Sequence, residues 1–196
     1  MKLRDTLIPT AIAAMAMLMT TGCDDEESGP DAFNGVFEVT NHTLSLNGCD
    51  TPQAVEAYDS FGHPYVVEGP FFSLKSESFF GQSVKTLEAC DASDPCPIER
   101  GEDEFGFSET FFEKRGDAWV TVATAAGGSG TSCTVTQTES ILEATETGMR
   151  VTRRIEQAFP EVADSDECLD FVDNPPTDQY ECSSFEEVLA EPFAAE

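Results

Sequence analysis

The segment from residue 133 to residue 144 alternates clearly in side-chain type, and no other pattern in the sequence constrains the fold as strongly. Successive side chains of a β-strand point to opposite faces of a sheet, so the alternation predicts one long strand. Gly148 predicts a hairpin turn, and residues 149–159 predict the returning strand. One parity of the first strand holds Cys133, Val135, Gln137, Glu139 and Ile141, and the other holds Thr134, Thr136, Thr138 and Leu142.

Further strand candidates recur roughly every 10–14 residues and are joined by turns rich in Gly, Asn and Asp. Arg115-Gly116-Asp117 is interpreted as one of these turns. The run predicts one all-β domain of antiparallel strands, either a β-barrel or a β-sandwich, and the sequence does not decide between them. It is loosely similar to the meander barrel of lipocalins, a similarity of architecture alone. The candidates span residues 36–46, 64–68, 71–77, 83–89, 105–113 and 119–125.

Little helix is predicted, and a single β-rich domain is expected over residues 33–196. Ser184 and Glu187 have the spacing of a capping box, which predicts a short helix over 184–190 that ends before Pro192. Residues 52–58 predict one or two further helical turns. The acidic segment that begins at residue 160 is expected to form a C-terminal arm over 160–196, held to the domain by disulfides.

The N-terminus carries a processing signal. Basic residues precede an apolar run over 7–19, which has the length of a signal-peptide core and is too short for a membrane-spanning helix. Thr20-Thr21-Gly22-Cys23 resembles the bacterial lipobox. The resemblance implies that residues 1–22 are removed and that Cys23 is acylated, for example with palmitate. The acidic residues 23–32 then form a tether, and the protein is a lipid-anchored component of the bacterial cell envelope, with the choice of membrane left open.

Six cysteines follow Cys23, and an even number in an exported chain is the pattern of a disulfide framework. Zinc is the competing interpretation, but the sequence has no Cys-x-x-Cys pair. We therefore expect three disulfides. Ranking the possible pairs by loop-closure entropy favours Cys90–Cys96 and Cys168–Cys182, which leaves Cys49–Cys133 as a long-range bridge.

The chain is strongly acidic, with 38 Asp and Glu against 10 Lys and Arg, and a formal charge of −28. This balance excludes electrostatic binding of DNA or RNA, whose phosphates require a basic partner. The acidity is also found in proteins of saline habitats, and it suits a surface that binds cations or basic partners; composition does not separate the two. The acidic clusters over 102–104 and 164–170 suggest weak calcium binding, with solvated surface charge as the alternative. The segment over 164–170 does not match an EF-hand loop, because Leu169 stands where such a loop needs Gly. No metal ligand set is therefore predicted, and no cofactor is predicted either.

The sequence predicts no enzymatic activity. Its two histidines, His42 and His63, lie in no nucleophile or metal motif. Ser129 lies among glycines, but residues 127–131 do not match the Gly-x-Ser-x-Gly elbow of serine hydrolases.

Phenylalanine is unusually frequent, with 15 residues against one Trp and three Tyr. In a small barrel, inward-facing Phe side chains either fill the interior or line a ligand cavity. We predict Phe37, Phe72 and Phe107 as ligand-binding residues, with core packing as the alternative. The residues expected to face the interior are Phe37, Val39, Phe72, Leu74, Phe107, Val120, Val135 and Val151.

Two functions follow from these features. The first is a non-enzymatic binding module for a small hydrophobic ligand or a protein. The second is a structural or adhesion component of the envelope that interacts with other molecules and has no ligand pocket. A large apolar cavity would favour the first, and a filled core with an exposed aromatic patch would favour the second.

Overall fold

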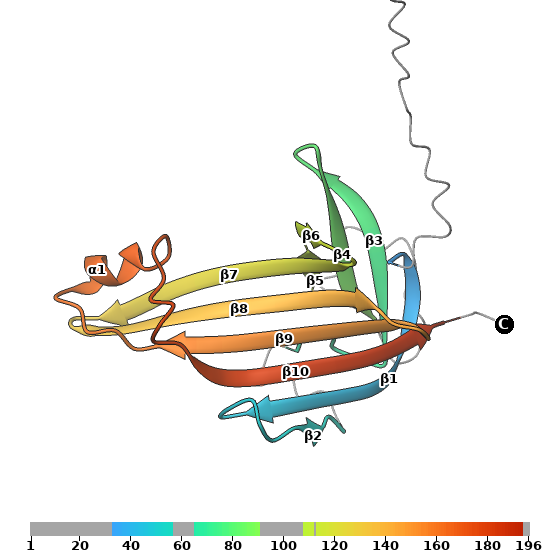
Figure 1. Ribbon diagram of the computed structural model, residues 1–196, viewed down its shortest axis with the longest axis horizontal. Helices are drawn as coiled ribbons and strands as arrows, with labels where there is room; N and C mark the ends of the chain where they lie inside the picture. Colours follow the sequence, from blue (N-terminus) through green and yellow to red (C-terminus); the bar gives the residue numbers. More distant parts are fainter. Residues whose placement is uncertain (1–32, 57–64, 91–107, 112, 194–196) are drawn as a thin grey trace, which may run out of the picture.

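Ten strands and one short helix form the part of the chain that the computed structural model describes, residues 33–56, 65–90, 108–111 and 113–193 (Figure 1). All the strand pairs are antiparallel. The strands are β1 (Gly35–Leu46), β2 (Gln53–Ala54), β3 (Phe71–Phe79), β4 (Gln82–Cys90), β5 (Ser108–Phe111), β6 (Glu113–Arg115), β7 (Ala118–Ser129), β8 (Ser132–Ala144), β9 (Met149–Ala158) and β10 (Glu181–Pro192), and the helix is α1 (Ser165–Asp170).

The sheet is curled into a nearly closed barrel (Figure 1). Its strand order is β5-β4-β3-β1-β10-β9-β8-β7-β6, and β2 pairs separately with β1. One residue separates β5 from β6; β5 pairs with β4, and β6 pairs with β7. Counted as one interrupted strand, β5 and β6 complete an eight-stranded meander in which β1 also pairs with β10. The all-β antiparallel prediction is confirmed, and of the two architectures it left open the protein adopts the barrel.

The alternation over residues 133–144 is confirmed in β8, and its two parities face different hydrophobic clusters. Leu142 belongs to the barrel core together with residues from the strands opposite. Val135 and Cys133 belong to a second cluster, which they form with Val162 and Cys168 of the segment around α1. The prediction that Val135 faces the interior was wrong, because it has the parity opposite to that of Leu142 and lies on the outer face.

The barrel interior is filled by large side chains. Phe37 of β1 stacks on Phe72 of β3, with ring centroids 5.3 Å apart. Val66 and Val67, which precede β3, are fully buried in the same core. Residues 65–67, which we call the plug segment, therefore fill part of the barrel interior. The core comprises Phe37, Val66, Val67, Phe72, Leu74, Leu87, Phe111, Trp119, Leu142, Met149, Val151, Val188 and Ala190, with Phe33 and Val39 packed against it.

The C-terminal segment differs from the prediction in its second half. Residues 160–180 form an arm that includes α1 and is held to β8 by a disulfide. Residues 181–192 form β10, which lies between β1 and β9, so the predicted helix over 184–190 was wrong. Burial there alternates with a period of two, and pairing on both sides overrides the local capping-box signal. The prediction of helical turns over 52–58 was also wrong in part, because Gln53 and Ala54 form the short strand β2.

The predicted disulfide pairing was wrong for two bridges. The structure joins Cys49 to Cys182 and Cys133 to Cys168, with Cα atoms 5.9 Å and 5.5 Å apart. Leu46 pairs with Ser184, so the antiparallel β1–β10 ladder brings Cys49 beside Cys182. Loop entropy ranks only the cost of closing a loop and does not include the proximity that the ladder supplies. The remaining predicted pair, Cys90–Cys96, includes Cys96, which lies outside the described residues.

The predicted signal peptide, Cys23 and the tether also lie outside the described residues, as does Phe107. In the part of the chain that the structure describes, no helix is long and apolar enough to cross a membrane.

The expected turn at Arg115-Gly116-Asp117 is confirmed, since β6 ends at Arg115, β7 begins at Ala118 and Gly116 has a φ of 62°. Arg115 donates a hydrogen bond to Glu113 at 2.8 Å and thereby lowers the pKa of that exposed carboxyl.

Candidate functional site

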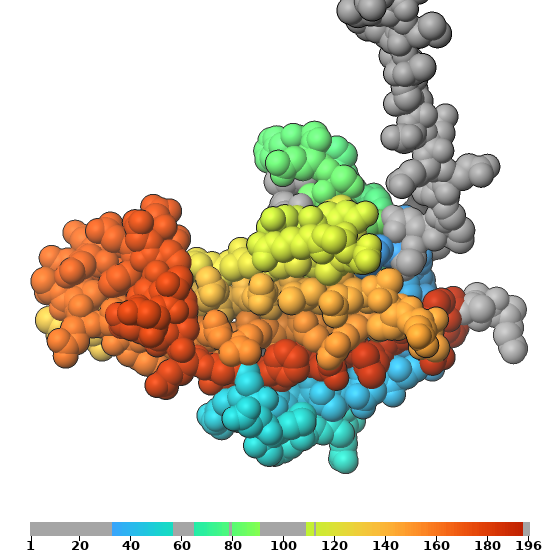
Figure 2. All heavy atoms as spheres, in the orientation of Figure 1, coloured from blue at the N-terminus to red at the C-terminus, as the bar shows by residue number. Residues whose placement is uncertain are grey.

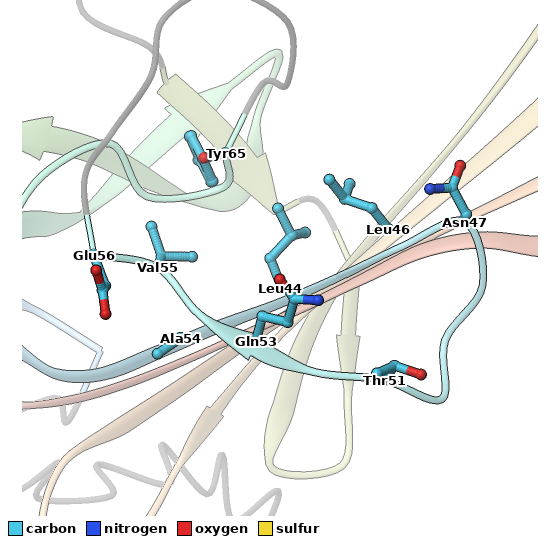
Figure 3. Close-up of a pocket in the computed structure, with 9 residues that line it drawn as sticks. All are labelled: Leu44, Leu46, Asn47, Thr51, Gln53, Ala54, Val55, Glu56 and Tyr65. Atoms are coloured by element: carbon cyan, nitrogen blue, oxygen red, sulfur yellow. The ribbon is translucent and has the colours of Figure 1, made fainter.

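A groove of about 510 Å³ lies beside the C-terminal half of β1 and is shown in Figure 3. Its walls combine apolar side chains with an exposed polar rim. In Figure 3, Leu44, Val55 and Tyr65 extend into the same space from three different stretches of chain. The lining residues are Leu44, Leu46, Asn47, Thr51, Gln53, Ala54, Val55, Glu56 and Tyr65.

The backbone around β1 explains how these residues meet. Leu44 and Leu46 share a parity of the strand, so both side chains point to one face. The chain then turns at Asn47 and Gly48, both with positive φ, and β2 returns along β1 with Leu44 paired to Gln53. The Val55 N–H donates to the His42 carbonyl at 2.9 Å and fixes the end of this return.

A buried polar pair, His42 and Glu186, lies next to the lining residue Tyr65. Glu186 of β10 accepts a hydrogen bond from His42 Nε2 at 2.8 Å, and both its carboxylate oxygens lie 2.9 Å from the Val66 N–H. Glu186 and His42 are 1 % and 5 % exposed. The Tyr65 ring, which forms a wall of the groove, makes an edge contact with the His42 ring at 5.6 Å between centroids. The Tyr65 wall of the groove therefore adjoins this pair, and the neighbouring Val66 is hydrogen-bonded to the barrel.

Two cationic side chains are also buried in the described part of the barrel, Lys85 and Arg153, and both have polar partners. Arg153 of β9 forms an ion pair with Glu109 of β5 and lies 3.4 Å from the Ser140 hydroxyl. Lys85 donates to the Ser76 hydroxyl at 2.5 Å and lies 5.6 Å from the centroid of the Trp119 ring. A charged side chain can be buried when it has such polar partners. We infer that Arg153 and Lys85 both stabilise contacts between strands on different sides of the barrel.

Two of the three aromatics predicted to bind a ligand lie in the packed core of the barrel. Phe37 and Phe72 are 3 % and 0 % exposed, stack on one another, and are not among the residues that line the groove. The structure supports the core-packing alternative for this pair. Leu46 and Tyr65, which do line the groove, were not predicted. The sequence offered one indication of the role of Leu46, because this apolar residue ends a strand directly before an Asn-Gly turn.

The acidic cluster over 164–170 is used in part by α1 itself. Asp164 caps the helix, since its Oδ1 accepts the N–H groups of Asp166 and Glu167 at 3.0 Å. Glu167 in turn accepts the Ala163 N–H at 2.6 Å. Within the described residues, no group of three His, Cys, Asp or Glu side chains is arranged to hold a metal ion. Residues 102–104 lie outside the described part, and calcium binding stays a prediction.

Comparisons with known proteins identify no relative: no protein-family model, no curated protein and no solved structure matches this chain. The groove, the buried polar pair beside Tyr65 and the N-terminal sequence signal are therefore the features from which we infer a function.

Proposed function

We propose that this protein is a non-enzymatic binding module of the bacterial cell envelope, anchored through Cys23, whose barrel binds one small apolar ligand in the groove beside β1. The observation that carries the proposal is the convergence of apolar side chains from β1, from the end of β2 and from the plug segment on one concave site. Small-molecule sites are commonly concave and combine apolar walls with a few polar groups that fix orientation. Polar atoms contribute more of the surface that lines this groove than apolar atoms do, so a ligand that also makes polar contacts at the rim fits best.

The size and chemistry of the groove indicate the class of ligand. Its volume of about 510 Å³ is within the usual range for small-molecule sites. Leu46 is 56 % exposed at its edge, and an apolar ligand would remove this surface from water. The rim residues Asn47, Gln53 and Glu56 offer amide and carboxylate groups. A ligand with an apolar body and a neutral or cationic polar end fits this combination best.

Binding of a fluorescent apolar probe tests the proposal. We expect saturable uptake at about one site per chain, and a bound compound in native mass spectra of the purified protein. Leu46→Trp introduces bulk at the edge of the groove and should weaken binding roughly tenfold, about 1.4 kcal/mol. Because Leu46 is already exposed, this variant should fold.

Val122→Trp is the matched control, since Val122 is 44 % exposed on β7 and is not among the groove residues. It should bind the probe as the unmodified protein does. An absence of saturable uptake, or equal weakening by both variants, would contradict a groove ligand. The alternative, a structural or interaction component of the envelope, would then be the better explanation. It already has support in the filled barrel interior and in the exposure of Phe159, Leu169 and Val172.

A further inference from the structure

The hairpin of β3 and β4 projects from the barrel (Figures 1 and 2). Its tip carries an exposed aromatic residue, Phe80. Phe79 pairs with Gln82, so Phe80 and Gly81 form a two-residue turn. Both have positive φ, 48° and 80°, as in a type I′ turn. Phe80 is 94 % exposed.

Phe80 is an unfavourable residue for this position on two grounds. Type I′ turns prefer Asn or Gly at their first central position, because a larger side chain at positive φ is strained. A ring that is 94 % exposed also leaves most of its apolar surface in water. The chain has a conventional solution elsewhere, since Asn47 and Gly48 occupy the positive-φ turn after β1. A strained and exposed aromatic points to a role outside the fold.

The hairpin tip is also poor in charge. Residues 76–83 contain one charged side chain, Glu77, in a protein with 38 acidic residues. Most of the other tip residues carry hydroxyl or amide groups, which can hydrogen-bond to lipid headgroups. A strongly acidic protein is repelled by an anionic membrane surface, and this repulsion is weakest where acidic side chains are few.

The tip lies at the end of the barrel where the described chain begins. Gly35 pairs with Leu74, and Asn34 Oδ1 accepts a hydrogen bond from the Ser76 hydroxyl at 3.0 Å. From Leu74, β3 continues for five residues to Phe79, a projection of about 17 Å at 3.3 Å per residue. The residues between Cys23 and Asn34 span at most about 35 Å when extended. A lipid on Cys23 therefore holds the membrane within reach of this hairpin.

We propose that the Phe80 tip inserts into the interface of the membrane that holds the lipid anchor and so orients the barrel on that membrane. The inference rests on the proposed anchoring through Cys23. One Phe side chain contributes roughly a tenfold gain in partition when buried, too little to bind a free protein. It is sufficient for a tethered one, because the tether raises the effective concentration of the tip at the surface.

Depth-dependent quenching tests the insertion. The acylated protein, residues 23–196, is reconstituted on phosphatidylcholine vesicles with or without bromine on the upper acyl chain, and flotation first establishes anchoring. Phe80→Trp should show a blue-shifted emission and several-fold quenching by brominated lipid. The native Trp119 is 8 % exposed and provides a constant background, measured in the unmodified protein.

Phe159→Trp is the matched control, because Phe159 is 66 % exposed and follows β9 at the opposite end of the barrel. It should show no lipid quenching. Phe80→Asn supplies a second test: it suits the turn, so the melting temperature should hold or rise. The protection that vesicles give to the hairpin amides in hydrogen exchange should be lost.

The outcomes separate the two proposals. If the protein does not float, both the anchor and the insertion are wrong. If it floats but the tip reporter is not quenched, or is quenched no more than the Phe159→Trp control, the insertion alone is wrong. A blue shift that depends on protein concentration and not on lipid would instead identify a second copy of the chain as the partner and would overturn the proposal.

Discussion

Glu186 on β10 accepts a hydrogen bond from His42 on β1 at 2.8 Å, inside the barrel, and the same carboxylate also accepts the Val66 N–H. One side chain therefore joins two paired strands to the plug segment that precedes β3. A buried carboxylate is costly unless it is fully hydrogen-bonded, so the three groups depend on one another. Because Tyr65 is adjacent to Val66 and forms a wall of the groove, this carboxylate also positions the proposed ligand site.

Replacing Glu186 should reveal this dependence. Glu186→Ala leaves the Val66 N–H and the His42 ring without their acceptor, and we expect a loss of about 3 kcal/mol in the free energy of unfolding. Glu186→Gln retains an oxygen acceptor for Val66 and should cost about 1 kcal/mol. Urea denaturation measures both values. Equal stability of the Ala variant and the unmodified protein would show that the carboxylate does not hold the plug.

The ion pair between Arg153 and Glu109 joins β9 to β5, strands that are not neighbours in the sheet. Their side chains are 4 % and 13 % exposed, so removing one partner leaves a buried charge. We expect Glu109→Ala to cost about 3 kcal/mol and the double variant Arg153→Met with Glu109→Leu to recover most of that loss. A double-mutant cycle built from Tm and urea data measures the coupling. A coupling energy near zero would mean that the pair does not stabilise closure of the barrel.

The strands of the barrel were predictable where the alternation is local. In β8 the alternation itself was recognised from the sequence, but its inner face was not, because Val135 was expected inside and the core contains Leu142, which has the opposite parity. The strand order and the disulfides could not be predicted, because they depend on pairing between residues far apart in the sequence. Cys49 meets Cys182 because β1 lies beside β10, and nothing near either cysteine in the sequence encodes that proximity. Strand order is decided by tertiary packing, which local patterns do not contain.

The candidate site was less predictable than the fold. Ser184 and Glu187 match a capping box, and this local signal concealed the fact that Glu186 shares its parity with the buried Val188. A charged residue on the apolar parity of a strand was the available indication of an internal hydrogen-bond network. Two of the three aromatics predicted as ligand contacts, Phe37 and Phe72, lie in the packed core. Phe37 and Phe72 stack closely enough to fill the interior that they were expected to line.

The disulfide between Cys133 and Cys168 holds α1 to the outer face of β8. Replacing both cysteines by Ala should cost about 2–4 kcal/mol, because the unfolded chain regains the entropy of a loop of 35 residues. The barrel core should persist, since it uses neither cysteine. Hydrogen exchange should therefore rise over 162–171 and remain slow in β1 and β10. Exchange that rises equally in all strands would show that the arm is required for the barrel.

The acidity of the protein predicts a strong dependence of stability on salt. The proposed cleavage before Cys23 would remove two of the 10 basic residues and one of the 38 acidic residues and leave a charge of −29 on 174 residues. Monovalent salt shortens the screening length from about 8 Å at 0.15 M to about 3 Å at 1 M, so the melting temperature should rise over this range. Calcium at equal ionic strength provides the comparison. If the charges act only through mutual repulsion, calcium and NaCl should stabilise about equally. A much larger effect of millimolar calcium would identify specific cation binding, and a melting temperature that does not change with NaCl would show that repulsion does not limit the stability of this fold.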